Sequence, residues 1–366
     1  MSRRFKRSIS ARAKIARGRR ETNRDGRSAV LDICIRWAPR ICRGAFFVIC
    51  AAALRSARPA GQKVRMEPFA YHTVVHALEA RRGWTEERRF AVAVHHAIDG
   101  HLAYSRYHAA GRQRAREGIG EEGVARLVDD FLETDVNPAI SFISALRHPA
   151  SALMAYNAYN AAANLGVRTS VTLAYPGVRG VGSLAASRAM VADSDDPQPC
   201  RTATLSVMGS VLEHVQSGGQ RMHRPTSLSR LAEFLGRGHG VAADVSRAIE
   251  DDWLAPVTDL PRRLGCQKRT MERRLKEVGL TAQSLRQADR MLRATAGLFS
   301  GDSATAIALD CGFSDLAHMS RSFRTACGMT PSMLIAIARH DDKLSGSPSR
   351  LPYRRPQESP HAGSEI

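Results

Sequence analysis

The sequence predicts an all-α protein: a C-terminal domain of two helix-turn-helix units joined by a linker helix, preceded by a smaller helical domain and a basic arm. Apolar residues recur at helical spacings over most of residues 66–340. Two segments near the C-terminus each have the order helix, glycine turn, helix with outward basic residues. The chain of 366 residues is long enough for two domains and flexible ends.

The first 65 residues carry most of the positive charge. They contain 18 Lys or Arg and 3 Asp or Glu, which makes +15 of the formal net charge of +19. We expect residues 1–65 to form a disordered basic arm, with Met66 as an alternative start of the protein. Because the rest of the chain carries only +4, a DNA-binding role depends on where its basic side chains lie.

An apolar run at residues 45–54 is about half of the ~20 residues that a membrane-spanning helix needs. A secretory signal has only a short basic segment before such a run, whereas here the whole basic segment precedes it. We therefore expect a cytoplasmic protein that has no membrane partner.

The helical domain is expected over residues 66–175, where glycine and proline separate four segments with helical apolar spacing. These segments are Tyr71–Ala80, Thr85–Ile98, Leu102–Arg116 and Glu121–Glu133. Residues 176–225 are rich in Pro, Gly and Ser, with one short helical piece at 204–216, and this composition predicts a linker.

The C-terminal domain is expected over residues 226–340, followed by a disordered tail at 341–366. Its linker helix is the amphipathic run 282–299, about 27 Å long at 1.5 Å per residue. That length is comparable with one turn of B-DNA, ~34 Å, so two recognition helices can reach successive major-groove segments. Pro261 is tolerated only in the first turn of a helix, so the first unit is expected to begin near Asp259, a candidate N-cap.

The second unit has a recognisable core and turn. Gly312 supplies the left-handed backbone that ends a helix, and Ser314 or Asp315 can cap the next one. Thr330-Pro331 marks the start of a final helix over residues 332–338. The residues expected in the core share one helical spacing: Ile307, Ala308, Cys311, Phe313, Met319 and Phe323.

The side chains that remain outside these cores are the candidate DNA contacts, because an Arg in the major groove can donate two hydrogen bonds to guanine. In the first recognition helix they are Lys268, Arg269, Glu272, Arg273 and Lys276. In the second recognition helix they are Ala317, His318, Arg321 and Arg324, with Leu316 also expected to face outward. The alternative is that the basic residues are ordinary solvated surface charges.

The C-terminal segment resembles the AraC/XylS family of bacterial transcription regulators over roughly residues 242–338. The resemblance is carried by the run Gly312 to Asp315, by Ser320-Arg321 and Phe323, and by Gly328 to Pro331. It implies a regulator that binds double-stranded DNA and acts on RNA polymerase, with a small-molecule effector or homodimerisation assigned to the other domain. The departures are Met319, where an aromatic residue is usual, and Pro261, where alanine is usual.

A fainter resemblance links residues 83–167 to the alkylhydroperoxidase D/carboxymuconolactone decarboxylase-like fold. Its active members have Cys-x-x-Cys-x-x-x-His after a turn such as Asp99-Gly100, and here His108 is retained while His101 and Tyr104 replace the cysteines. Thiol-disulfide chemistry needs both sulfurs, so we expect no catalytic residues and no enzyme. An enzyme with an appended DNA-binding domain is the alternative, and a third is a chain in which only residues 220–340 fold.

The cysteines and histidines indicate neither a metal nor a cofactor. The seven cysteines contain no Cys-x-x-Cys pair, so they are expected to be reduced thiols. Six histidines of the helical domain are candidate metal ligands, but no carboxylate stands beside them in a recognised ligand pattern, so we expect no metal site. They are His72, His76, His95, His96, His101 and His108.

Overall fold

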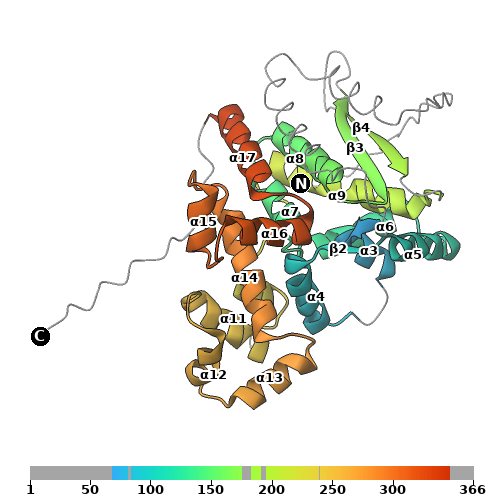
Figure 1. Cartoon of the computed structure of the whole chain (residues 1–366). Helices are drawn as coiled ribbons and strands as arrows, with labels where there is room; N and C mark the ends of the chain where they lie inside the picture. Colours follow the sequence, from blue (N-terminus) through green and yellow to red (C-terminus); the bar gives the residue numbers. More distant parts are fainter. Residues whose placement is uncertain (1–67, 81–83, 175–182, 191–194, 239, 347–366) are drawn as a thin grey trace, which may run out of the picture.

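The computed structural model describes residues 68–80, 84–174, 183–190, 195–238 and 240–346. Most of them are helical, and the strands form two antiparallel pairs (Figure 1). The predicted all-α class is confirmed, with these two small sheets as an addition. The predicted basic arm, its apolar run and the end of the tail lie outside the described residues. None of the described helices is both long enough and apolar enough to cross a membrane.

The N-terminal half forms a helical domain around a buried core. Its elements are β1 (Phe69–Tyr71), α3 (His72–Glu79), α4 (Glu86–Ile98), β2 (His101–Ala103), α5 (Tyr104–Glu117), α6 (Glu121–Leu132), α7 (Pro138–Ala145), α8 (Pro149–Ala162), β3 (Val167–Ala174), β4 (Ser183–Met190) and α9 (Gln198–Gln216). The four predicted helices correspond to α3, α4, α5 and α6. The third begins two residues later than predicted, because His101–Ala103 pairs with Phe69–Tyr71 as a strand.

Helix α9 corrects the prediction of a linker over residues 176–225. Its residues Val207, Val211 and Val215 recur every fourth position and are buried at 3%, 1% and 3% exposure. They pack in the core of the helical domain, where α9 contacts α5, α6, α7 and α8. The proline and glycine residues that suggested a linker flank this helix instead of replacing it. Strand β4 also lies in the range predicted as linker, paired with β3.

The C-terminal half contains the two predicted helix-turn-helix units. Its elements are α10 (Leu228–Phe234), α11 (Val241–Asp251), the short helix η1 (Val257–Asp259), α12 (Leu260–Arg263), α13 (Lys268–Glu277), α14 (Ala282–Gly297), α15 (Ala304–Asp310), α16 (Leu316–Cys327) and α17 (Pro331–Ser345). Pro261 lies in the first turn of α12 as predicted, but the Asp259 side chain does not cap that helix. Helix α17 continues to Ser345, so the predicted tail does not begin at residue 341.

Local residue choices explain the second unit. Asp315 is the N-cap of α16, and its Oδ1 accepts a hydrogen bond from the His318 backbone N–H at 2.6 Å. Gly312 has φ +77°, and a Cβ there would also lie 3.4 Å from Arg290 Nε. The predicted core is confirmed, because all six of its residues are buried: Ile307, Ala308, Cys311, Phe313, Met319 and Phe323.

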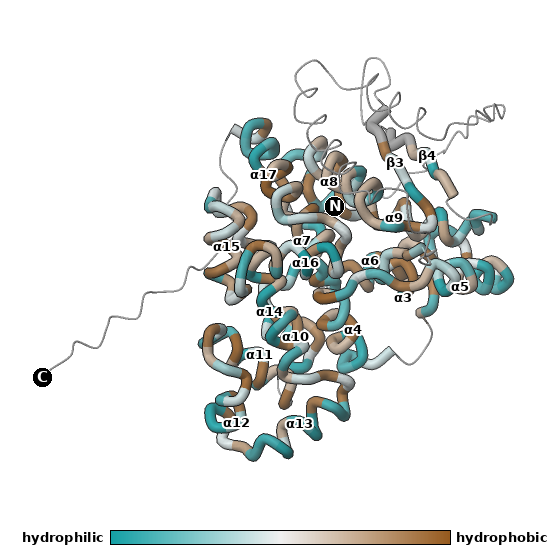
Figure 2. The backbone as a smooth tube through the Cα atoms, viewed as in Figure 1, coloured by the Kyte–Doolittle hydropathy of each residue, from teal (hydrophilic) through white to brown (hydrophobic). Residues whose placement is uncertain are grey.

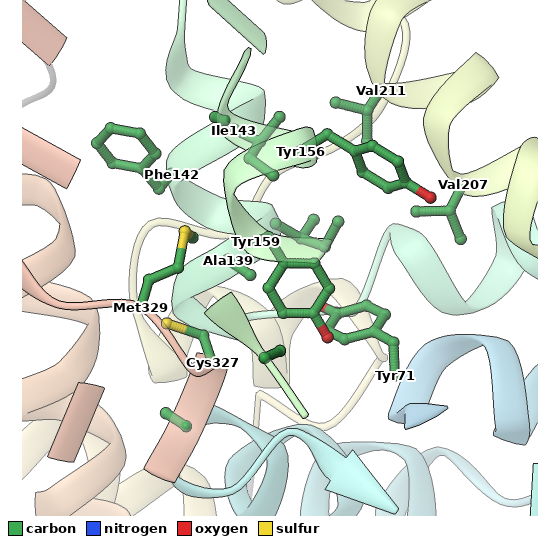
Figure 3. Close-up of a cluster of buried hydrophobic side chains, with 14 of the residues drawn as sticks. Tyr71, Ala139, Phe142, Ile143, Tyr156, Tyr159, Val207, Val211, Cys327 and Met329 are labelled. Carbon is green, nitrogen blue, oxygen red and sulfur yellow. The ribbon is translucent and has the colours of Figure 1, made fainter. Parts of the chain in front are cut away.

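The two halves share their hydrophobic cores. Phe90 and Val94 of α4 are buried in the same cluster as the apolar residues of the first helix-turn-helix unit. The second unit packs into the main cluster of the helical domain. Figure 3 shows Cys327 and Met329, at the end of α16 and just beyond it, beside Tyr159 of α8 and Phe142 of α7.

Candidate nucleic-acid interface

The first recognition helix, α13, presents its basic face to solvent. Met271 and Leu275 are 2% and 0% exposed, so they fix the inner side of the helix in the core. Arg269 and Arg273 lie four residues apart on the outer side, and both are exposed. Figure 2 shows α12 and α13 as largely hydrophilic at one end of the molecule. The predicted contacts of this helix are therefore all exposed: Lys268, Arg269, Glu272, Arg273 and Lys276.

Two ion pairs lie along the outer side of α13. Lys268 Nζ lies 3.8 Å from Glu272 Oε1, and Arg273 Nε lies 3.9 Å from Glu277 Oε1. All four side chains are more than half exposed, so each pair contributes little to stability. The basic groups can therefore exchange these carboxylates for phosphate or base oxygens at small cost.

The second recognition helix, α16, is anchored by Met319 and Phe323, which are both fully buried. Ala317, Arg321 and Arg324 lie on the opposite side and are exposed, as predicted. This surface has fewer basic groups than that of α13, because it presents only two guanidinium groups beside the methyl group of Ala317. Ala317 can contact a thymine methyl but cannot donate a hydrogen bond.

His318 and Leu316 are placed differently from the outward orientation that was predicted. The His318 ring is half-buried, with Nδ1 3.2 Å from Ser314 Oγ and the ring edge-on to Phe313. Its hydrogen bonding thus serves the turn before α16. Leu316 is also half-buried and packs against the core, because the first turn of α16 faces inward at this position.

Helix α14 joins the two units. Its 16 residues correspond to about 24 Å, and its predicted apolar residues Leu285, Ala288, Met291 and Leu292 are buried. Figure 1 shows α14 running between α13 and α16. Gln287 Nε2 of α14 donates to Ser322 Oγ of α16 at 3.3 Å. The two recognition helices are therefore joined through one continuous helix.

Further exposed basic residues near α13 are candidates for the same interface. Arg262 and Arg263 of α12 and Arg274 of α13 are also exposed. The side chain of Arg262 is 84% exposed, with only a 3.9 Å contact to Asp259. Arg262 and Arg263 could have been predicted from the sequence, because they are basic residues that lie just before the glycine turn, at the end of α12.

The histidines of the helical domain do not form one group. His72, His76 and His96 lie together, with the rings of His72 and His96 stacked at 4.2 Å. His95 lies against the Gly279 carbonyl, and His108 Nε2 lies 2.7 Å from Asp195 Oδ1. Among the residues that the structure describes, no cluster of His, Cys, Asp or Glu side chains is arranged to hold a metal ion.

Comparison with known proteins identifies the C-terminal segment. The family model of a helix-turn-helix domain matches residues 260–336, which include α12 to α16 and the start of α17. This match supports the AraC-like DNA-binding domain inferred from the sequence. No curated protein and no solved structure matches the chain significantly. The part of the chain that carries α13 and α16 is therefore a helix-turn-helix DNA-binding domain.

Proposed function

We propose that the protein is a sequence-specific transcription regulator that reads two successive major-groove segments of double-stranded DNA. The observation that carries this proposal is the pair of recognition helices, α13 and α16, held by the single helix α14 with basic side chains exposed on both. Arg269 and Arg273 read the first segment, and Arg321 reads the second. We also propose a cytoplasmic location, because a regulator of this kind acts on the genome.

Selection of bound fragments from a random-sequence duplex library, followed by hydroxyl-radical footprinting, tests this function. We expect one consensus sequence with two protected segments about one helical turn, or 10–10.5 base pairs, apart on the same face of the duplex. A single protected segment would refute the two-segment reading. Binding without any consensus would refute sequence specificity.

We propose that the helical domain regulates the DNA-binding domain and is not an enzyme. Burial raises the pKa of the Cys200 thiol and of the Cys327 thiol to about 12, so neither is a reactive thiolate at neutral pH. The two positions of the resembling redox motif hold His101 and Tyr104. Purified protein should therefore reduce no organic hydroperoxide in the presence of a dithiol, and measurable turnover would overturn this proposal.

The partners of the helical domain are part of the same proposal. Its core contains a cavity of about 50 Å³ lined by aromatic residues that include Tyr71, Tyr104, Tyr107, Tyr156 and Tyr159. This volume is below the ~150 Å³ of an engineered cavity that binds benzene, so an apolar effector would have to enlarge it. We also propose that the protein forms a homodimer and contacts RNA polymerase. Sedimentation of the protein with and without DNA tests the homodimer.

A further inference from the structure

The end of the second recognition helix is held by the helical domain. The carbonyl of Ala326 lies in the last turn of α16, where backbone acceptors have no partner within their own helix. It accepts one hydrogen bond from the Gly100 backbone N–H at 3.0 Å and a second from Asn137 Nδ2 at 2.8 Å. Both donors belong to the helical domain, and Ala326 and Asn137 are fully buried.

Asn137 has no freedom to rotate at this contact. Its Oδ1 accepts from the Ala139 backbone N–H at 2.9 Å and thereby caps α7. Its Nδ2 also donates to the His96 carbonyl at 2.6 Å. Because Oδ1 faces a donor and Nδ2 faces two carbonyls, only one orientation of the amide satisfies the network.

The buried side chains of His72 and Asp135 contact both residues that donate to Ala326. Asp135 Oδ1 accepts from the Asn137 backbone N–H at 2.8 Å, and Asp135 Oδ2 lies 3.2 Å from His72 Nε2. On its other side, His72 Nδ1 donates to the Gly100 carbonyl at 3.0 Å. One pair of charged side chains therefore fixes the position of Asn137 and of Gly100.

The surroundings of Asp135 favour its charged form. Burial alone would raise the pKa of Asp135, but the charge of His72 and the hydrogen bonds that Asp135 accepts lower it below its ordinary value. Two of those bonds come from the Tyr71 hydroxyl at 2.7 Å and the Thr73 hydroxyl at 2.5 Å.

The two halves are closely packed at this contact. A Cβ at Gly100 would lie 2.2 Å from Asn137 Nδ2 and 2.6 Å from the Ala326 carbonyl oxygen. A Cβ at Gly328 would lie 2.8 Å from the Ala163 Cβ of the helical domain. The end of α16 thus lies directly against the helical domain. The position of α16 therefore depends on the position of that domain.

We propose that Asn137 is a positioning residue for DNA recognition: through the Ala326 carbonyl it sets the orientation of α16 on the second DNA segment. The His72–Asp135 pair holds Asn137 and Gly100 for this purpose. This inference rests on the proposed function, in which α16 reads one of two segments. It assigns to the helical domain an indirect part in base readout, through the position of α16.

The test compares Asn137→Ser with Asp341→Asn in the full-length chain. Serine at position 137 can still cap α7, but it removes the donor to Ala326. Asp341 of α17 is equally buried and accepts from the backbone N–H groups of Arg147 and His148 at 3.0 Å each, so its replacement weakens a second contact between the halves that does not involve α16. The probes are the duplex selected by the wild-type protein and two versions in which either segment is scrambled.

We expect Asn137→Ser to lose about tenfold in preference for the intact second segment, the equivalent of one lost hydrogen bond to a buried acceptor. Preference for the first segment should be unchanged, and Asp341→Asn should keep both preferences. An equal loss on both segments, or no loss, would overturn the proposal. If Asn137→Ser does not fold, Thr73→Val, which removes one hydrogen bond from Asp135, should give a smaller change restricted to the second segment.

The wild-type protein and Arg321→Ala separate this inference from the function on which it rests. If Arg321→Ala keeps the wild-type preference for the second segment, then α16 does not read bases and the proposed function fails. If Arg321→Ala loses that preference and Asn137→Ser retains it, only the positioning role of Asn137 fails.

Discussion

The Nε2 atoms of His76 and His96 lie 2.9 Å apart in the interior of the helical domain. His96 Nδ1 donates to the Asp99 carbonyl at 2.7 Å, so His96 Nε2 is the acceptor and His76 Nε2 the donor. Burial, followed by the positive charge of His72, lowers the pKa of His96 to about 2, and burial also lowers the pKa of His76. The His96 ring is therefore neutral in the folded protein at neutral pH.

The first prediction is a loss of stability in mild acid. His96 has an ordinary pKa of about 6.5 in the unfolded chain, so below that pH the unfolded state binds a proton that the folded state does not. The free energy of unfolding should fall by about 2 kcal/mol between pH 7.5 and pH 5 from this one group. Urea denaturation at a series of pH values measures it. His96→Gln should reduce the pH dependence and the exposed neighbour His95→Gln should keep it; equal slopes for both variants would contradict this assignment.

The second prediction concerns the residues that we propose read bases. Arg273→Ala and Arg321→Ala should each cost about 1–3 kcal/mol on the selected duplex and relax the preference at one base position. Lys276→Ala should instead weaken binding to all duplexes alike, because a phosphate contact carries no sequence information. Competition binding on single-base variants of the duplex measures both effects. Arg116→Ala, an exposed arginine of α5, is the control; wild-type specificity in both Arg variants would show that the readers are misassigned.

A third prediction follows from the packing of α4 in the first helix-turn-helix unit. Phe90 is 4% exposed in that core, so Phe90→Ala should lower the free energy of unfolding by about 3–5 kcal/mol. Phe234, which is 41% exposed, offers a control with the same side chain and a much smaller expected effect.

Limited proteolysis of the wild-type chain should give one protected unit that contains both halves. Separate stable fragments from the two halves would contradict the shared core.

The fourth prediction separates charge from specificity. Residues 1–65 hold +15 of the net charge, and basic segments bind phosphates of any sequence by releasing counterions. A chain that starts at Met66 should have weaker affinity for random DNA and a shallower salt dependence. Its preference for the selected duplex should be equal or higher. Salt titrations on both duplexes measure this, and a loss of preference on truncation would show that the N-terminal segment reads sequence.

The recognition helices could be predicted because their information is local. The spacing of Met271 and Leu275, and of Met319 and Phe323, defines the inner face of each helix, so the outer residues follow without knowledge of other contacts. The turn signals at Gly312 and Asp315 are also local. His318 was misplaced because its hydrogen bond to Ser314 competes with exposure, and helical spacing alone cannot show that competition.

The contacts between the halves could not be predicted in this way. Periodicity shows that Phe90 and Val94 are buried, but it does not show what buries them. The apolar spacing of Val207, Val211 and Val215 was present in the sequence, yet the flanking Pro and Gly residues dominated the prediction of a linker. The contact of Asn137 with Ala326 could not be predicted either, because an asparagine before a proline indicates only a helix cap.

The contact of Gly100 and Asn137 with Ala326 has a consequence for domain exchange. A chimera that joins the helix-turn-helix units to another N-terminal domain would leave the Ala326 carbonyl without its two buried donors. It would also expose the apolar surface that α4 covers. Exchanges of the helical domain in this protein should therefore keep α4, the loop to β2 and the start of α7 with the DNA-binding units, and exchange only the elements beyond them.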